Sequence, residues 1–159
     1  MRLGDLSWVN FIGQTPFFRA AFSGDVAAMK LLLENGADHK IETEQGTTPL
    51  MAAAGINWVV AQTYTESEES SLAAVKLCLD LGEDINHANS MGLTAAHGAA
   101  NRGSDSILQF LADHGANMTA KDKEGRTPYV WSEGVFLATN APVARPSSMA
   151  LIKKLTGEK

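Results

Sequence analysis

Few residues in this sequence stand in patterns that could do chemistry. Ser104, in the segment GSDS at 103–106, offers a hydroxyl group beside an acidic neighbour, and Cys78 is the only thiol. Neither lies in a nucleophile elbow, a phosphate-binding loop or a zinc-binding helix motif, because the sequence contains none of these patterns. We therefore expect Ser104 or Asp105 to begin a helix and Cys78 to be an inert buried thiol.

The acidic and histidine side chains also lack the fixed geometry of an active site. Glu66, Glu68 and Glu69 are close in sequence, but neighbours in a flexible turn are not held as an acid–base pair. We interpret them as part of a solvated loop. The four histidines have no metal-ligand spacing; they are His39, His87, His97 and His114. The sequence therefore predicts no catalytic residue, no cofactor and no metal site, and a protein that is not an enzyme.

Length, composition and charge narrow the class of protein. At 159 residues the chain is long enough for one domain with a hydrophobic core and too short for two typical ones. Its apolar fraction of 45% and charged fraction of 19% are typical of a folded protein. The net charge is −5 and no basic cluster is present, so we expect no nucleic-acid partner.

No segment has the composition of a membrane span or a signal peptide. No apolar run approaches the roughly 20 residues that a transmembrane helix needs. The N-terminal segment MRLGDLSWVNFIG lacks the continuous apolar stretch of a signal peptide. A single cysteine rules out an internal disulfide framework. We therefore expect no membrane association and, by default, a reducing, cytoplasmic location.

One short pattern recurs four times along the chain. It reads GQTPFFRAAFSGD from Gly13, GTTPLMAAAGIN from Gly46, GLTAAHGAANRGS from Gly92 and GRTPYVWSEG from Gly125, so the first glycines lie 33, 46 and 33 positions apart. Each copy is followed by an apolar stretch that ends in glycine, most clearly in VAAMKLLLENGAD, LAAVKLCLDLGED and SILQFLADHGAN. The repeat predicts two short helices and a turn per copy, stacked as a solenoid.

The residue types within each copy fit this interpretation. A threonine hydroxyl can cap the first helix, and proline follows it in three of the four copies. Paired alanines are small enough for neighbouring helices to approach closely. The threonines are Thr15, Thr48, Thr94 and Thr127, and the alanine pairs are Ala20/Ala21, Ala53/Ala54 and Ala99/Ala100.

The motif G-x-T-P-L-H-x-A-A, followed by a helix and G-A-D, resembles the ankyrin repeat, whose period is about 33 residues. The resemblance implies an all-α, ankyrin-like helical solenoid of β-turn/helix-turn-helix repeats, two of which carry inserted loops. It places one domain over 1–159, with a finger stub at 1–12 and repeats at about 13–45, 46–91, 92–124 and 125–159. His97 is the only residue that keeps the motif's histidine, which in the family is an internal hydrogen-bonding strut.

The resemblance also implies a non-catalytic scaffold that binds a protein partner of unknown identity through its finger tips and inner helices. The side chains along the expected row change from apolar through acidic and neutral to basic, which would orient a partner. The residues carried over are Phe11, Ile12, Gln14, Glu42, Glu44, Gln45, Thr47, Ser90, Met91, Leu93, Lys121, Lys123 and Arg126.

Two repeats are enlarged between their helices, at about 57–70 and 134–147. Because one repeat separates them, the two inserted loops could meet across it. An alternative hypothesis is a small-molecule binder or enzyme with a pocket between these loops. The candidate lining of that pocket is Trp58, Tyr64, Trp131 and Arg145. The other interpretation is that these loops cover exposed core along an edge of the solenoid.

The N-terminal end is rich in aromatic residues. Phe11, Phe17 and Phe18 lie within the first eighteen positions, and the chain begins in the middle of a repeat. Exposed apolar patches usually mark contacts. We therefore expect either self-association through this end or a structural segment of a longer ankyrin array.

Overall fold

The structure is a computed structural model that describes residues 11–58, 67–135 and 142–157. The described residues form helices and connecting loops, with no β-strand among them. The helices are α1 (Pro16–Ser23), α2 (Val26–Glu34), α3 (Pro49–Ala54), α4 (Glu68–Asp80), α5 (Ala95–Arg102), α6 (Asp105–Asp113), α7 (Pro128–Glu133) and α8 (Pro146–Thr156).

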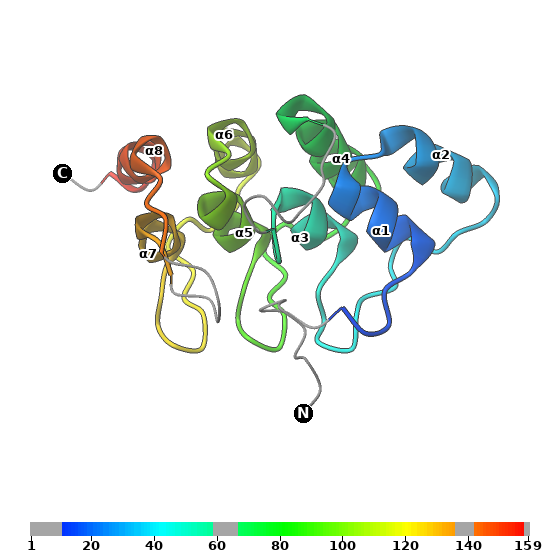
Figure 1. The fold of residues 1–159 in the computed structure, drawn as a ribbon, viewed down its shortest axis with the longest axis horizontal. Helices are drawn as coiled ribbons and strands as arrows, with labels where there is room; N and C mark the ends of the chain where they lie inside the picture. Colours follow the sequence, from blue (N-terminus) through cyan, green and yellow to red (C-terminus); the bar gives the residue numbers. More distant parts are fainter. Residues whose placement is uncertain (1–10, 59–66, 136–141, 158–159) are drawn as a thin grey trace.

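The helices stack in two rows, as Figure 1 shows. The inner row consists of α1, α3, α5 and α7, each in contact with the next, and the outer row consists of α2, α4, α6 and α8. Three loops extend below the inner row and join α2 to α3, α4 to α5 and α6 to α7. We call them the second finger (38–47), the third finger (84–93) and the fourth finger (117–126). This arrangement is the predicted all-α helical solenoid.

Threonine starts the inner helices, as the sequence predicts. Thr15 Oγ1 accepts a hydrogen bond from the Phe18 amide at 3.1 Å, and Thr48 Oγ1 accepts one from the Met51 amide at 3.2 Å. In both helices proline takes the first position, where its missing N–H group is not needed. Thr127 stands in the same place before α7 but makes no such capping bond.

Asp or Ser starts three of the outer helices. The side chain of Asp25 caps α2, that of Ser67 caps α4 and that of Ser104 caps α6. The interpretation of Ser104 as a helix-start residue is therefore confirmed. The interpretation of the acidic cluster as a loop is wrong for Glu68 and Glu69, which form the first turn of α4, where a helix dipole favours negative charge. Glu66 lies outside the described residues.

The core runs along the line where the two rows meet. The three alanine pairs named above are buried, which lets the inner helices pack closely. The closest approach is at Gly98, where an added Cβ would lie 2.6 Å from the Ile56 amide nitrogen. Glycine is therefore required for α5 to pack on the end of α3. No helix within the described ranges has the length and apolar character needed to span a bilayer.

Candidate functional site

The three fingers are built in the same way. The backbone closes each turn, with Thr43 N–H bonded to Thr47 O, Asn89 N–H to Leu93 O and Asp122 N–H to Arg126 O. The first residue of each pair is buried, and its side chain accepts a second bond from a backbone N–H four residues later. Sequence reasoning missed these residues, although each stands three positions before the glycine of its repeat. That shared phase was the signal that could have identified them.

Backbone hydrogen bonds also hold the fingers to one another. The Glu44 amide donates to Ile12 O at 2.9 Å, the Ser90 amide to Gln45 O at 2.8 Å, and the Lys123 amide to Met91 O at 3.0 Å. Asn89 adds a side-chain bond from its amide to Thr47 Oγ1. The finger tips are therefore fixed relative to each other and present a continuous row.

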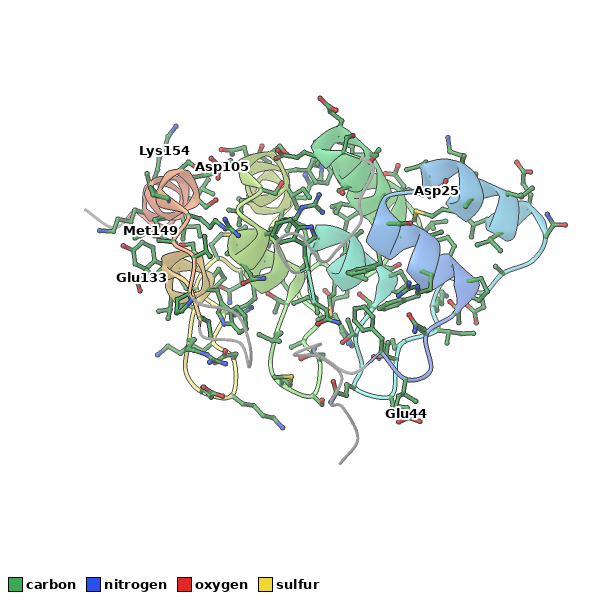
Figure 2. The ribbon with its side chains drawn as sticks, viewed as in Figure 1. Asp25, Glu44, Asp105, Glu133, Met149 and Lys154 are labelled. Atoms are coloured by element: carbon green, nitrogen blue, oxygen red, sulfur yellow. The ribbon has the colours of Figure 1, made fainter. Side chains whose placement is uncertain are left out.

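Most of the residues predicted to bind a partner are accessible on this row. Figure 2 shows Glu44 at the tip of the second finger, away from the helices. Exposed members of the row are Ile12, Gln14, Glu42, Glu44, Ser90, Lys121 and Lys123, and half-buried members are Phe11, Gln45 and Met91. The acidic side chains lie on the second finger and the lysines on the fourth, so the predicted change in charge runs along one surface.

Three predicted binding residues do not present a free side chain there. Thr47 and Leu93 are both 0% exposed, because each follows the finger glycine and turns back toward the helices. Arg126 is half-buried, and its guanidinium pairs with Asp122 and with Glu124 at 2.8 Å each. For Thr47 and Leu93 the prediction is wrong, and Arg126 belongs to the framework of its finger.

A polar network joins the third and fourth repeats. His97 Nδ1 accepts from the Thr94 amide at 3.1 Å, and its Nε2 donates to Arg126 O at 3.1 Å. Since a carbonyl oxygen only accepts, the proton lies on Nε2 and the ring is neutral. Burial lowers the pKa of His97, which favours the same neutral form. The predicted role of His97 as an internal strut is confirmed.

Asp122 is the centre of this network. Its Oδ2 accepts from Trp131 Nε1 at 2.9 Å and from Arg126 Nε at 2.8 Å. Burial acts to raise the pKa of Asp122, but these hydrogen bonds outweigh it and hold the pKa below its ordinary value. Trp131 is 1% exposed and packs its ring against the Arg126 guanidinium. The prediction that Trp131 lines a loop pocket is therefore wrong.

A cavity of about 230 Å³ lies at the base of the second and third fingers. Its lining comprises His39, Lys40, Glu42, Thr48, Pro49, Gly82, Glu83, Asp84 and His87. Small-molecule sites usually exceed about 300 Å³ and are mostly apolar. The cavity is thus smaller than an ordinary ligand site.

Glu83 lies beside this cavity, and its carboxylate supports α3. Its Oε2 accepts from the Leu50 amide at 2.9 Å, while its buried Oε1 makes no hydrogen bond of ordinary geometry. The side chains of Cys78 and Thr48 also lie close enough to the carboxylate to act to lower its pKa. Burial raises the pKa of Glu83 to about 6, and the charge of Glu42 acts in the same direction. The nearby Cys78 thiol is buried and its pKa is also raised, chiefly by desolvation, so it is unsuited to act as a nucleophile.

A second polar cluster lies at the opposite end of the inner helices from the fingers. The guanidinium carbons of Arg102 and Arg145 lie 5.6 and 5.9 Å from the centre of the Trp58 ring. Trp58 follows α3 and Arg145 precedes α8, so the flanks of the two insertions meet across the third repeat. Sequence reasoning missed Arg102, because its place in the cluster depends on the packing of α5. Tyr64 lies outside the described residues.

Hydrogen bonds between serine and carboxylate groups join the starts of the outer helices. Ser104 and Ser106 donate to Glu68 Oε1 at 2.8 and 2.6 Å, and these bonds lower the pKa of Glu68. Ser148 of α8 donates to Asp105 of α6, which Figure 2 labels beside that helix. The Ser104 hydroxyl is therefore already engaged, in a position that suits helix capping.

The aromatic N-terminal end is partly core. Phe17 and Phe18 are 0% exposed, and the half-buried Phe11 ring packs edge-on against Phe18 and Phe22. Ile12 and Leu31 remain more than half exposed. Self-association through this end stays a prediction, and residues 1–10 lie outside the described residues.

Within the described ranges there is also no group of three side chains able to hold a metal ion.

Comparison with known proteins agrees with this architecture. The family model described as "Ankyrin repeats (3 copies)" matches residues 64–133, and the model described as "Ankyrin repeat" matches residues 13–38. Together the two matches span more than half of the chain.

Three relatives illustrate the similarity. Ankyrin repeat and SOCS box protein 16 of Mus musculus is 35% identical over 115 residues, which cover 72% of this chain and 24% of that protein. The B-cell lymphoma 3 protein homolog of Mus musculus is 31% identical over 125 residues, covering 78% of this chain and 25% of that protein. BCL-6 corepressor-like protein 1 of Homo sapiens is 44% identical over 88 residues, covering 55% of this chain and 4% of that protein. The chain thus spans a quarter or less of these relatives.

Proposed function

The chain belongs to the ankyrin-repeat family, and on that premise we propose that it is a non-catalytic module that binds a protein partner through its finger row. Ankyrin repeats generally mediate protein–protein interaction, and repeat solenoids use their extended concave surface for this purpose. The partner would lie across the second, third and fourth fingers.

The observation that carries the proposal is the exposed and graded finger row. Ile12 and Gln14 begin the row, Glu42 and Glu44 follow on the second finger, Ser90 and Met91 lie on the third, and the lysines of the fourth finger end it. Backbone bonds between fingers fix these tips before binding, so little entropy is lost when a partner docks. A row that changes from apolar through acidic to basic along its length favours one orientation of the partner.

The side chains most suited to chemistry support a structural role instead. Cys78 is buried with a raised pKa, and the Ser104 hydroxyl bonds to Glu68. The cavity at the base of the second and third fingers is smaller than an ordinary ligand site. We therefore favour binding over catalysis. The lone buried thiol also suits a reducing compartment such as the cytoplasm.

The test is affinity capture from the native source with the intact chain and with a finger variant. The variant combines Glu42→Lys, Glu44→Lys, Met91→Ala and Lys121→Glu, all on the finger row. A captured protein would be identified, purified and titrated against both forms. We expect the variant to bind about 100-fold more weakly or worse, because central contacts and charges of both signs change together.

Asp80→Lys is the matched control. Asp80 is exposed at the end of α4 in the outer row, and this single change adds the same net positive charge as the finger variant. It should leave the affinity unchanged. Equal binding by the finger variant and the intact chain would contradict the proposal, as would equal losses from the two variants.

A further inference from the structure

Trp58, Arg102 and Arg145 form a cluster that draws on three repeats. Both guanidinium groups lie within 6 Å of the centre of the indole ring. Such distances are typical of cation–π contacts. All three residues are half-buried, so the cluster is partly desolvated yet remains accessible at the surface.

The position of Arg145 is fixed by contacts with two repeats. Its backbone N–H donates to Ser132 O at 2.7 Å, and its Nε donates to Asn101 O at 3.2 Å. A Cβ atom on Gly103 would lie 2.6 Å from Arg145 Cδ, so the glycine makes room for the arginine to lie against the end of α5. The Asn101 side chain in turn donates to Trp58 O at 3.3 Å. The site is therefore preformed.

The two arginines retain unused hydrogen-bond donors. Arg145 uses Nε alone, and neither Arg102 nor Arg145 forms an ion pair in the described part of the chain. Of the two carboxylates at the starts of the neighbouring outer helices, Glu68 is bonded to Ser104 and Ser106, and Asp105 to Ser148. Burial lowers the pKa of Arg102, with the charge of Glu68 opposing, but a guanidinium stays protonated at neutral pH.

We propose that this cluster is a second docking site, at which Arg102 and Arg145 bind a carboxylate side chain from an acidic segment of a protein partner, over the face of Trp58. The proposal rests on the proposed function in that it assumes a protein partner, but it concerns a surface apart from the fingers. Planar guanidinium groups match the two oxygens of a carboxylate, and partly desolvated arginine and tryptophan residues dominate many protein interfaces.

The test uses a short acidic peptide, acetyl-Gly-Glu-Gly-Asp-Gly-amide, and its Gln/Asn counterpart. Binding is followed by NMR through the Trp58 indole N–H cross-peak, which the Trp58→Phe variant assigns. We expect a saturable shift with the acidic peptide, with a dissociation constant on the order of 1 mM. The uncharged peptide should cause no shift.

Two arginine variants and one lysine variant distinguish specific binding at the docking site from non-specific attraction of the peptide to positive charge. Arg145→Gln should weaken the acidic peptide at least about tenfold, and Arg102→Lys, which keeps the charge but loses the planar fork, at least about threefold. Lys154→Gln is the control, because Lys154 lies on α8, the helix that Arg145 precedes, but points away from the helix rows (Figure 2). It should change the affinity less than about twofold.

Several outcomes would overturn the docking site. These are equal effects of Arg145→Gln and Lys154→Gln, an equal shift with the uncharged peptide, or an equal shift with inorganic phosphate at the same concentration. If Arg145→Gln leaves peptide binding unchanged while the finger variant loses its captured partner, only this inference fails. If the finger variant keeps that partner, the proposed function fails whatever the Trp58 signal does.

Discussion

Two repeats hold the start of an inner helix in different ways. In the third repeat, His97 sits in the first turn of α5, and its neutral ring links the Thr94 amide to Arg126 O of the next finger. In the second repeat the equivalent residue is Met51, which cannot make such bonds and fills the core. There the Glu83 carboxylate reaches the Leu50 amide of α3 instead.

The difference lies in how well each polar group is satisfied. Both ring nitrogens of His97 are hydrogen-bonded, and Asp122 beside it accepts bonds from Trp131 and Arg126. Glu83 has one buried oxygen without a well-formed hydrogen bond, and its pKa is raised to about 6 because burial outweighs the contacts with the Leu50 amide and the Cys78 and Thr48 side chains. Both repeats therefore place a carboxylate where burial disfavours its charge, but hydrogen bonds outweigh burial at Asp122 and do not outweigh it at Glu83.

Of the substitutions that test this comparison, removal of the Asp122 side chain should change the free energy of unfolding most. Asp122→Ala removes the carboxylate that accepts from Trp131 Nε1, Arg126 Nε and two backbone N–H groups of the fourth finger. We expect the free energy of unfolding to fall by about 3–5 kcal/mol, because a buried, bonded charge is lost from its network. Urea denaturation would measure it.

Asp80→Ala is the control for this prediction, because Asp80 is exposed at the end of α4. It should change the free energy of unfolding by less than about 0.5 kcal/mol. If Asp122→Ala lowered the free energy of unfolding no more than Asp80→Ala does, the supports of α3 and α5 would not differ as described.

Glu83→Gln should instead raise the free energy of unfolding at neutral pH. The folded pKa of about 6 lies above the ordinary 4.5, so the folded state binds more protons and stability is lost as pH rises through about 6. Glutamine keeps an acceptor for the Leu50 amide and cannot ionise. We expect the variant to be more stable than the parent at pH 7.5, by up to about 2 kcal/mol, and similar to it at pH 4.5.

Unfolding curves at both pH values would check this expectation. Glu69→Gln is a suitable control, since Glu69 is an exposed carboxylate in the first turn of α4. A Glu83→Gln variant that is equally destabilised at both pH values would mean that the carboxylate is fully satisfied.

We expect the smallest effect on the free energy of unfolding from the titration of His97. Burial lowers the pKa of His97, but its bond to Arg126 O and the charge of Asp122 partly offset that lowering. Its folded pKa lies below 6.5, so the unfolded state binds more protons, and stability should rise with pH in the range below 6.5. The pH dependence of stability that Glu83 contributes runs in the opposite direction. The rise due to His97 should therefore appear most clearly in the Glu83→Gln background.

Adding His97→Asn to that background should abolish the rise, because asparagine does not titrate. Unfolding curves between pH 5 and 7 would measure both forms. A rise that persists without His97 would assign the trend to another group.

Much of the fold followed from residues close together in sequence. Threonine and proline at helix starts, glycine after the outer helices, and alanine pairs at a fixed interval all act within one or two turns of chain. The finger row was predicted in outline for the same reason. The burial of Thr47 and Leu93 was not, because the direction of a side chain in a turn depends on the packed helices behind it.

The sequence by itself determined the repeat, its period and the order of helices and fingers, since these depend on local backbone preferences and hydrophobic spacing. Only the tertiary structure decided which polar groups meet. Trp131 was drawn into the Asp122 network rather than a loop pocket, and Arg145 reached Trp58 across the third repeat. Such contacts join distant parts of the chain, and their geometry exists only once the repeats have stacked.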